Sequence, residues 1–302
     1  MKAWGIDLGG TKIECIVVDG GTNVVVRKRI PTETHKGYEH ILSQVKKLVD
    51  ITKHEANESP VHIGFATPGV LEPDTQLMKN CNTTCMNGKP MHCDLEAVLG
   101  VPVKLANDAN CFALSETLLG AGRSHPNADV VFGIIMGTGV GGGLVVNKKI
   151  IAGRHGIGGE WGHNILEENG AQCYCGKRGC VETVIAGPAL EKFYANETAT
   201  NKSLLEILNL HVAGADHAAT ATINRLVENF AKAVSTLINV IDPDLIVVGG
   251  GVGNIELLYT EGYERIKKYI FNNGKVSTVI CKPVLGDSAG VFGAALLWNE
   301  TQ

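Results

Sequence analysis

Apolar and polar residues along the chain follow two patterns. Short, mostly apolar runs of the length of buried strands occur at residues 3–7, 13–18, 24–30, 61–65, 101–105, 130–136, 144–147 and 245–248. Repeats of apolar residues at i, i+3 and i+4 predict helices, the clearest of them at 38–49 and 223–241, with shorter ones at 110–119 and 289–298. Strands that alternate with helices are typical of an α/β fold.

Composition and charge place the chain among globular enzymes. Of its 302 residues, 44% are hydrophobic and 19% are charged. The net charge of −4 favours neither a nucleic acid nor an anionic membrane as a partner. Nine cysteines, an odd number, are more typical of a reducing compartment than of a disulfide framework. Because no apolar run reaches about 18 residues and the first residues lack a signal-peptide pattern, we expect a cytoplasmic protein without a membrane-spanning segment.

A turn with two glycines follows the first predicted strand. The backbone N–H groups of Gly9 and Gly10 and the hydroxyl of Thr11 can bind phosphate oxygens, beside the positive charge of Lys12. Asp7, at the end of the strand, can hold Mg²⁺ directly or through water, because that ion prefers oxygen ligands. The spacing differs from that of a Walker loop. Taken alone, the turn also fits an ordinary glycine hairpin.

The order of strand, glycine-rich turn and strand occurs again about 130 residues later. The second turn contains Gly137, Thr138, Gly139, Gly141 and Gly142. A third turn follows the strand at 245–248 and consists of Gly249, Gly250 and Gly251. A glycine triplet can lie against a purine or a ribose without a side-chain clash. The two hairpins predict a duplicated fold with two phosphate loops that face each other.

Two polar segments have both a structural and a functional interpretation. The segment 79–94, which includes Asn82, either presents hydrogen-bond partners to a sugar or is a solvated connection. Asp108 follows the strand at 101–105 and precedes a helix. It either caps that helix, a common use of aspartate, or acts as a general base at the carboxyl end of a sheet strand.

The segment from 158 to 182 carries a set of metal-binding residue types. Cys173, Cys175 and Cys180 have the spacing C-x-C-x4-C in a glycine-rich stretch, and His163 lies ten positions upstream. Three thiolates and an imidazole form a closed tetrahedral site for structural zinc. Unremarkable thiols or a redox pair are the alternatives, but the number of ligands favours zinc. The metal would then fix the loop that carries Glu160 and Glu182.

Together these segments resemble the ROK family of sugar kinases, within the actin-like/hexokinase ATPase superfamily. The motifs that carry the resemblance are D-x-G-G-T-K at 7–12, N-D-A-N at 107–110, G-T-G-x-G-G-G at 137–143, G-E-W-G-H at 159–163, C-x-C-G-x2-G-C-x-E at 173–182 and D-P-D…G-G-G at 242–251. The resemblance implies a two-lobed α/β fold with duplicated β-sheet domains and a central cleft for ATP and sugar. The expected lobes are residues 1–118 with 289–302, and residues 119–288.

The resemblance also implies a role for each candidate residue. Asp108 is similar to the base that takes the proton of the sugar 6-hydroxyl. The residues expected to hold the other hydroxyls are Asn107, Glu160, His163 and Glu182, with Gly69 lining the cleft and His163 also serving zinc. The glycine turns around Gly9, Gly137 and Gly249 resemble the nucleotide loops. ATP, Mg²⁺ and structural Zn²⁺ are the expected cofactors, and the expected assembly is a homodimer.

The segment 82–88 and the C-Y-C-G-K pattern resemble the fructokinase and mannokinase branch most, with fructose as the expected substrate. The branch of N-acetylglucosamine kinases is close, and glucose, mannose and N-acetylmannosamine remain alternatives. A sugar-sensing repressor of the same family would carry a helix-turn-helix before the first phosphate loop, where Asp7 leaves no room for one. An actin-like or chaperone ATPase would lack the sugar-binding carboxylates and the cysteine cluster.

Overall fold

The computed structural model describes residues 2–299, which divide into two compact units. Unit 1 comprises residues 1–126, 143–159 and 284–302, and unit 2 comprises residues 127–142 and 160–283. The chain passes from unit 1 to unit 2 at 126/127 and returns for the last time at 283/284. These two crossings lie within ten residues of the expected lobe boundaries at 118/119 and 288/289. The return of residues 143–159 to unit 1 has no counterpart in the sequence prediction.

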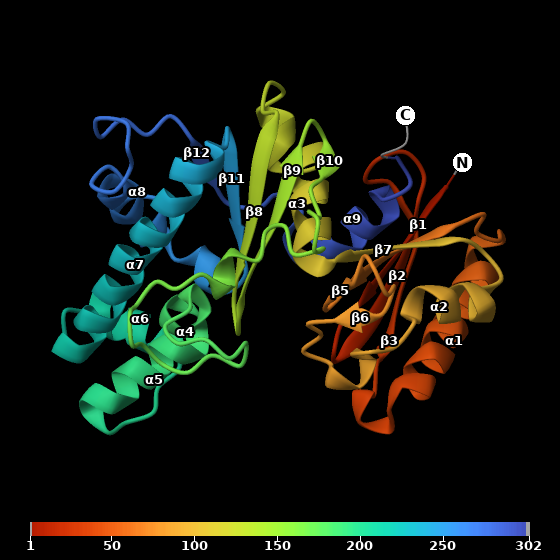
Figure 1. The fold of residues 1–302 in the computed structure, drawn as a ribbon, viewed down its shortest axis with the longest axis horizontal. Coiled ribbons are helices and arrows are strands. Elements are labelled where there is room, and N and C mark those ends of the chain that lie inside the picture. Colours follow the sequence, from red (N-terminus) through yellow and green to blue (C-terminus); the bar gives the residue numbers. More distant parts are fainter. Residues whose placement is uncertain (1, 300–302) are drawn as a thin grey trace. The chain divides into compact units, whose positions relative to one another are not determined.

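The elements of unit 1 follow the predicted alternation (Figure 1). Its strands are β1 (Ala3–Leu8), β2 (Lys12–Val18), β3 (Val24–Pro31), β4 (Ile63–Thr67), β5 (Val70–Leu71), β6 (Met78–Lys79), β7 (Val103–Asn107) and β10 (Lys149–Ile150). Its helices are α1 (Tyr38–Ala56), α2 (Met91–Leu99), α3 (Asp108–Leu118) and α9 (Ala289–Leu296). Short 3-10 turns, such as the one at Ala121–Ser124, connect them.

The main sheet of unit 1 has the strand order β3-β2-β1-β4-β7. Strands β1, β2 and β3 pair antiparallel, whereas β1, β4 and β7 pair parallel. Helices α1 and α2 lie on one face of this sheet and α9 on the other (Figure 1). Parallel β1, β4 and β7 therefore bring their carboxyl ends, with Asp7, Thr67 and Asn107, to the same edge of the sheet.

Helix α9 packs directly on the sheet backbone. A Cβ at Gly5 of β1 would lie 2.4 Å from the carbonyl oxygen of Val291, and one at Gly64 of β4 would lie 1.9 Å from that of Ala294. Glycine at both positions is therefore required by the close approach of helix and strand. Helix α9 thus covers one face of a sheet that contains β1, the first strand of the chain to be described.

A buried carboxylate ties together the two ends of unit 1 that lead into unit 2. Glu116, on α3, is completely buried. Its oxygens accept hydrogen bonds from the backbone N–H groups of Ala121 at 2.9 Å, Val284 at 3.0 Å and Leu285 at 2.8 Å. Three amide donors compensate the burial of the charge. The unit 1 segments next to both outer crossings are thereby fixed to one helix.

Unit 2 contains the second glycine-rich hairpin and most of the remaining helices. Its elements are β8 (Val130–Met136), the start of β9 (Val140–Val146), α4 (Val181–Ile185), α5 (Gly187–Thr198), α6 (Leu204–Val212), α7 (His217–Ile241), β11 (Leu245–Gly249), α8 (Glu261–Ile266) and β12 (Val279–Cys281). The second sheet has the order β10-β9-β8-β11-β12, in which β8, β11 and β12 pair parallel. The chain passes from unit 2 into unit 1 within β9.

Helix α7 is the longest helix of unit 2, and its apolar stripe is buried as the sequence predicts. It packs against α5 and α6 through a cluster that includes Tyr194, Ile207 and Ile223. Asp216 caps its N-terminus by accepting hydrogen bonds from the N–H groups of Ala218 and Ala219. Among the described residues, no helix is both long and apolar enough to cross a membrane.

Candidate functional site

The first glycine turn is held in place through its backbone. The N–H of Gly9 donates to the carbonyl of Lys12 at 3.0 Å, and the hydroxyl of Thr32 donates to the carbonyl of Gly9 at 2.7 Å. Gly10 and Thr11 remain exposed at the tip. The turn thus has fixed carbonyls and accessible N–H groups, as a phosphate-binding turn requires.

Asp7 lies behind this turn in an environment rich in carboxylates. Burial raises its pKa to about 7, and the nearby charges of Asp108 and Glu14 contribute, against the opposing effect of Lys12 and Arg29. A Cβ at Gly290, in the first turn of α9, would lie 3.3 Å from its Oδ2. Repulsion between carboxylates from β1 and α3 identifies a place where a divalent cation would be stabilised.

Asp108 begins helix α3 directly after β7, two residues beyond the strand end that the sequence predicted. The N-cap of α3 is Asn107, whose Oδ1 accepts a hydrogen bond from the N–H of Ala109 at 2.9 Å. The Oδ1 of Asp108 accepts from the same N–H at 2.7 Å, and Asp108 is exposed. Because Asn107 supplies the cap, helix capping does not account for the carboxylate of Asp108.

Two acidic residues and a histidine gather in unit 2. The Oε2 of Glu182 accepts a hydrogen bond from the N–H of Val140 at 3.0 Å, and a Cβ at Gly139 would lie 2.6 Å from that oxygen. Burial raises the pKa of Glu160, which the charge of His163 lowers and that of Glu182 raises. The second glycine turn and the predicted sugar-binding carboxylates therefore lie together.

The predicted metal ligands converge on one point. Donor atoms of His163, Cys173, Cys175 and Cys180 all lie within 4.8 Å of one another. The Sγ of Cys173 is 3.6 Å from Nδ1 of His163, and the sulfurs of Cys175 and Cys180 are 3.6 Å apart. A tetrahedral zinc with bonds of roughly 2.0–2.3 Å separates its ligands by roughly 3.5–3.8 Å. The arrangement therefore fits zinc.

The chemistry of the thiols agrees with this geometry. Burial, with the hydrogen bonds and charges of the neighbouring thiols, raises the pKa of Cys180 to about 12. Buried thiols of this kind need a cation in order to ionise. Gly179, with φ +68°, lies against the backbone of Glu167, so that no other residue fits this position of the knuckle.

Tyr174 belongs to this site although the sequence did not single it out. Its hydroxyl lies 3.0 Å from Nε2 of His163, and the two rings meet edge to face at 5.1 Å. Although Tyr174 is 74% exposed, desolvation of its hydroxyl and the charges of Glu182 and Glu160 raise its pKa to about 12. The phenol hydroxyl therefore contacts Nε2 of His163, the ring nitrogen that faces away from the sulfurs. Its position between two of the cysteines was the only available signal.

Two residues predicted to contact the sugar, Gly69 and Asn82, lie in turns or loops of unit 1. A Cβ at Gly69 would lie 2.5 Å from both Sγ of Cys81 and the carbonyl oxygen of Lys79, so the turn after β4 excludes a side chain. Asn82 is exposed, in a loop that Asn87 fixes through two hydrogen bonds with the backbone of Cys81. The segment 79–94 is also less irregular than predicted, because α2 begins at Met91.

The other glycine turns differ in detail from the sequence prediction. Gly141 and Gly142 lie within β9 and not in the turn, which consists of Gly137, Thr138 and Gly139. Gly249 ends β11, and Gly250 adopts φ +83°, where a Cβ would lie 2.2 Å from the carbonyl oxygen of Met136. The two turns of unit 2 therefore lie against each other, as two walls of one nucleotide site would.

Comparisons with known proteins agree with this arrangement. The family model described as "ROK family" matches residues 3–301. An N-acetyl-D-glucosamine kinase from Vibrio parahaemolyticus is 36% identical over 97% of this chain and 98% of its own length, and one from Vibrio atlanticus is 37% identical over the same shares. The solved ROK hexokinase of Thermus thermophilus superposes with a TM-score of 0.87 at 32% identity, covering 98% of this chain and 97% of that chain.

A ROK family glucokinase from Streptomyces griseus, solved with glucose and AMPPNP, has a TM-score of 0.78 at 26% identity and covers 98% of this chain and 99% of that chain. The fold is therefore that of the actin-like ATPases, in the form that sugar kinases use. The chain belongs to the ROK family. The resemblance and the fold class expected from the sequence are both confirmed.

Proposed function

We propose that this protein transfers the γ-phosphate of ATP to the 6-hydroxyl of an N-acetylated hexosamine, most readily N-acetylglucosamine. The observation that carries the proposal is the match over nearly the full length of both chains to N-acetyl-D-glucosamine kinases at 36–37% identity. The expected preference for fructose finds no support in these relatives. Hexose kinases of the same fold support the reaction type independently of the exact sugar.

Asp108 is the proposed base. Its carboxylate is exposed at the carboxyl end of β7, and Asn107 already supplies the helix cap. A base must reach the attacking hydroxyl within hydrogen-bond distance, which an exposed side chain at a strand end can do. The carboxylate of Asp7, which Asp108 repels, would hold the Mg²⁺ that neutralises charge on the phosphates.

Sugar hydroxyls are hydrogen-bond donors and suit carboxylate acceptors. Glu160, Glu182 and His163 are the proposed partners in unit 2, and Asn107 and Gly69 those in unit 1. The turns around Gly9, Gly137 and Gly250 are the proposed phosphate and nucleotide contacts. A homodimer, a cytoplasmic location and the contribution of Asn82 stay predictions.

We further propose that His163, Cys173, Cys175 and Cys180 hold one structural zinc ion. Support comes from the distances among their donor atoms, which fit a tetrahedral ion. A closed set of four protein ligands leaves no coordination position for water, so the metal would stabilise the loop rather than act on the substrate. The loop in question carries Glu160 and ends just before Glu182.

An ADP-release assay coupled to NADH oxidation tests the kinase proposal. Equal concentrations of N-acetylglucosamine, N-acetylmannosamine, glucose, mannose and fructose should be compared with ATP and Mg²⁺. We expect the highest kcat/KM with N-acetylglucosamine. A higher value with fructose or glucose refutes the assignment of the sugar, and ADP release independent of every sugar refutes the kinase.

A further inference from the structure

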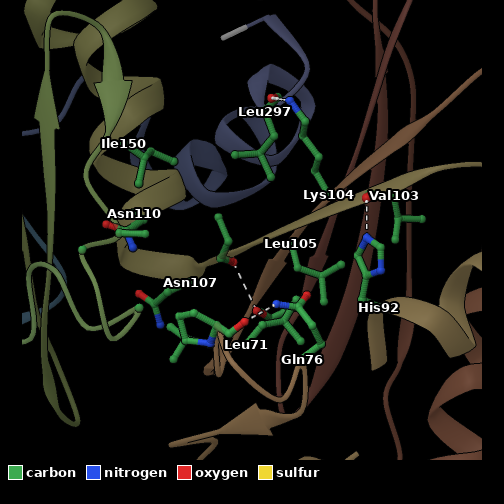
Figure 2. Close-up of a pocket in the computed structure, with 17 residues that line it drawn as sticks. Leu71, Gln76, His92, Val103, Lys104, Leu105, Asn107, Asn110, Ile150 and Leu297 are labelled. Carbon is green, nitrogen blue, oxygen red and sulfur yellow. Dashed lines mark hydrogen bonds between the residues drawn. The ribbon is translucent and has the colours of Figure 1, made fainter. Parts of the chain in front are cut away.

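A cavity of about 450 Å³ lies along the outer edge of β7 (Figure 2). Its walls come from the turn after β5, from β7 and α3, and from the loop after β10 and the end of α9. All of these segments belong to unit 1. Neither Asp7 nor Asp108 is part of its lining. The cavity is therefore separate from the carboxylates assigned to the reaction, although Asn107 contributes to both.

One wall contains a buried amide whose oxygen lacks a hydrogen-bond partner in the described part of the chain. Asn110, in the first turn of α3, is only 3% exposed. Within residues 2–299, its Oδ1 has no hydrogen-bond partner. An unsatisfied buried polar group destabilises a fold by roughly 1–3 kcal/mol, so such groups are rare unless something else satisfies them. An amide that lines a cavity points to a ligand with hydroxyl or amide groups.

The sheet edge adds a second pair of polar groups. The N–H of Val103 donates to Oε1 of Glu96 at 3.1 Å, and its carbonyl lies 3.1 Å from Nε2 of His92. The backbone of Val103 thus faces away from β4, the only main-sheet neighbour of β7 among the described strands. Because backbone direction alternates along a strand, the N–H and carbonyl of Leu105 face the same way, into the cavity.

The charge of the cavity is positive. Lys104 is the only permanently charged side chain in its described lining, which includes no Asp or Glu. Its ammonium donates to the carbonyl of Leu297 at 3.1 Å and lies 4.7 Å from the ring centre of Trp298. No ion pair involves it in the described part of the chain. Figure 2 shows Lys104 and Asn110 on different walls, separated by the apolar side chains of Ile150 and Leu297.

We propose that this cavity binds a small hydroxylated anion of the sugar phosphate class, with its hydroxyls on Asn110 and the Leu105 backbone and its anionic group on Lys104. Asn110 lies two residues after Asp108 in the same helical turn. A ligand on its amide therefore acts on the turn that carries the proposed base. The proposal rests on the proposed function in one respect, since the reaction product is itself one such ligand.

Titration calorimetry on the full chain tests the proposal. Saturating N-acetylglucosamine and a non-hydrolysable ATP analogue fill the catalytic site. N-acetylglucosamine 6-phosphate, glucose 6-phosphate, inorganic phosphate and glucose are then added in separate titrations. We expect one equivalent of sugar phosphate to bind at least about tenfold more tightly than phosphate or glucose, because only the whole ligand contacts both walls. A preference between the two sugar phosphates distinguishes the product from other phosphorylated sugars.

Two variants locate the binding. Asn110→Ala and Lys104→Met should each weaken sugar phosphate binding at least about tenfold, whereas Lys47→Met, an exposed lysine of α1, should leave it unchanged. If Asn110→Ala folds poorly, the affinity of Lys104→Met for sugar phosphate still tests the proposal. Absence of binding with the catalytic site filled, equal binding of phosphate alone, or unchanged affinity in Lys104→Met overturns the proposal. Sugar phosphate binding that Lys104→Met weakens, in a protein that phosphorylates no sugar, would refute the kinase and leave this site standing.

Discussion

Replacement of Asp108 by asparagine separates chemistry from structure at the proposed base. The asparagine side chain has the same shape but accepts no proton at neutral pH. General-base catalysis contributes about 10²–10⁴-fold. This range corresponds to roughly 3–5 kcal/mol of activation free energy. We therefore expect kcat to fall at least about 100-fold, with little change in the KM for the sugar.

The structure also predicts the stability of this variant. Loss of a helix cap costs about 1 kcal/mol, or roughly 2–4 °C in Tm for a domain of 150–250 residues. Here Asn107 keeps the cap, and the variant removes a charge that repels Asp7. At pH 8, where Asp7 is ionised, the Tm of Asp108→Asn should therefore be equal to or above that of the parent protein.

The assay combines the coupled ADP measurement with a thermal melt of the same preparation. Asp50→Asn, on the exposed side of α1, is the matched control and should keep full activity. If Asp108→Asn retains more than about a tenth of the parent kcat, Asp108 is not the base. If it melts several degrees lower at pH 8, the carboxylate has a structural role at the start of α3, where it accepts from the N–H of Ala109.

Three further predictions follow from the described contacts. Protein purified without added zinc should contain about one zinc per chain, and Cys180→Ser should lose both the metal and several degrees of Tm; a metal-free parent protein contradicts this. Tyr174→Phe removes the hydroxyl that contacts Nε2 of His163 and leaves this nitrogen to the sugar. The KM for the sugar should therefore fall about fivefold at unchanged zinc content. An unchanged KM would show that the phenol and the sugar do not compete for His163. The pKa of Asp7 is about 7 in the folded protein against 3.8 in the unfolded chain, so its ionisation destabilises the fold by roughly 4 kcal/mol. The free energy of unfolding, measured with urea, should therefore fall as the pH rises from about 4 through 7. In Asp7→Asn this free energy should change little over the same pH range.

The sequence predicted those elements whose pattern is local. The strand at 130–136 and the helix ending at Ile241 occur where the apolar residues place them. Strand β7 was predicted two residues too early, because its end is set by pairing with β4, where Thr67 opposes Asn107. The glycines of β9 were assigned to a turn because glycine is common there. In the structure, Gly143 is needed in the strand since a Cβ would lie 2.5 Å from the carbonyl oxygen of Ala109.

The candidate site shows the same division. The four metal ligands lie within 18 residues of sequence, so their spacing alone indicated a common site. Tyr174 and Asn110 were missed because their importance depends on which groups the fold places beside them. Both residues belong to motifs that carry the resemblance, but those motifs do not show which groups the two side chains contact. Only the three-dimensional contacts show that Tyr174 is paired with His163 and that Oδ1 of Asn110 has no hydrogen-bond partner within residues 2–299.

The packing of α9 determines when this protein can fold as it is synthesised. Unit 1 needs residues 284–296 to cover β1 and β4 and to supply two of the amides that bind Glu116. Those residues are synthesised after residues 127–283, so we expect one face of the unit 1 sheet to stay uncovered until unit 2 has been synthesised. Unit 1 can therefore complete its packing only after unit 2 has been synthesised. We expect the apolar face of its sheet to be a site for chaperone binding until α9 covers it.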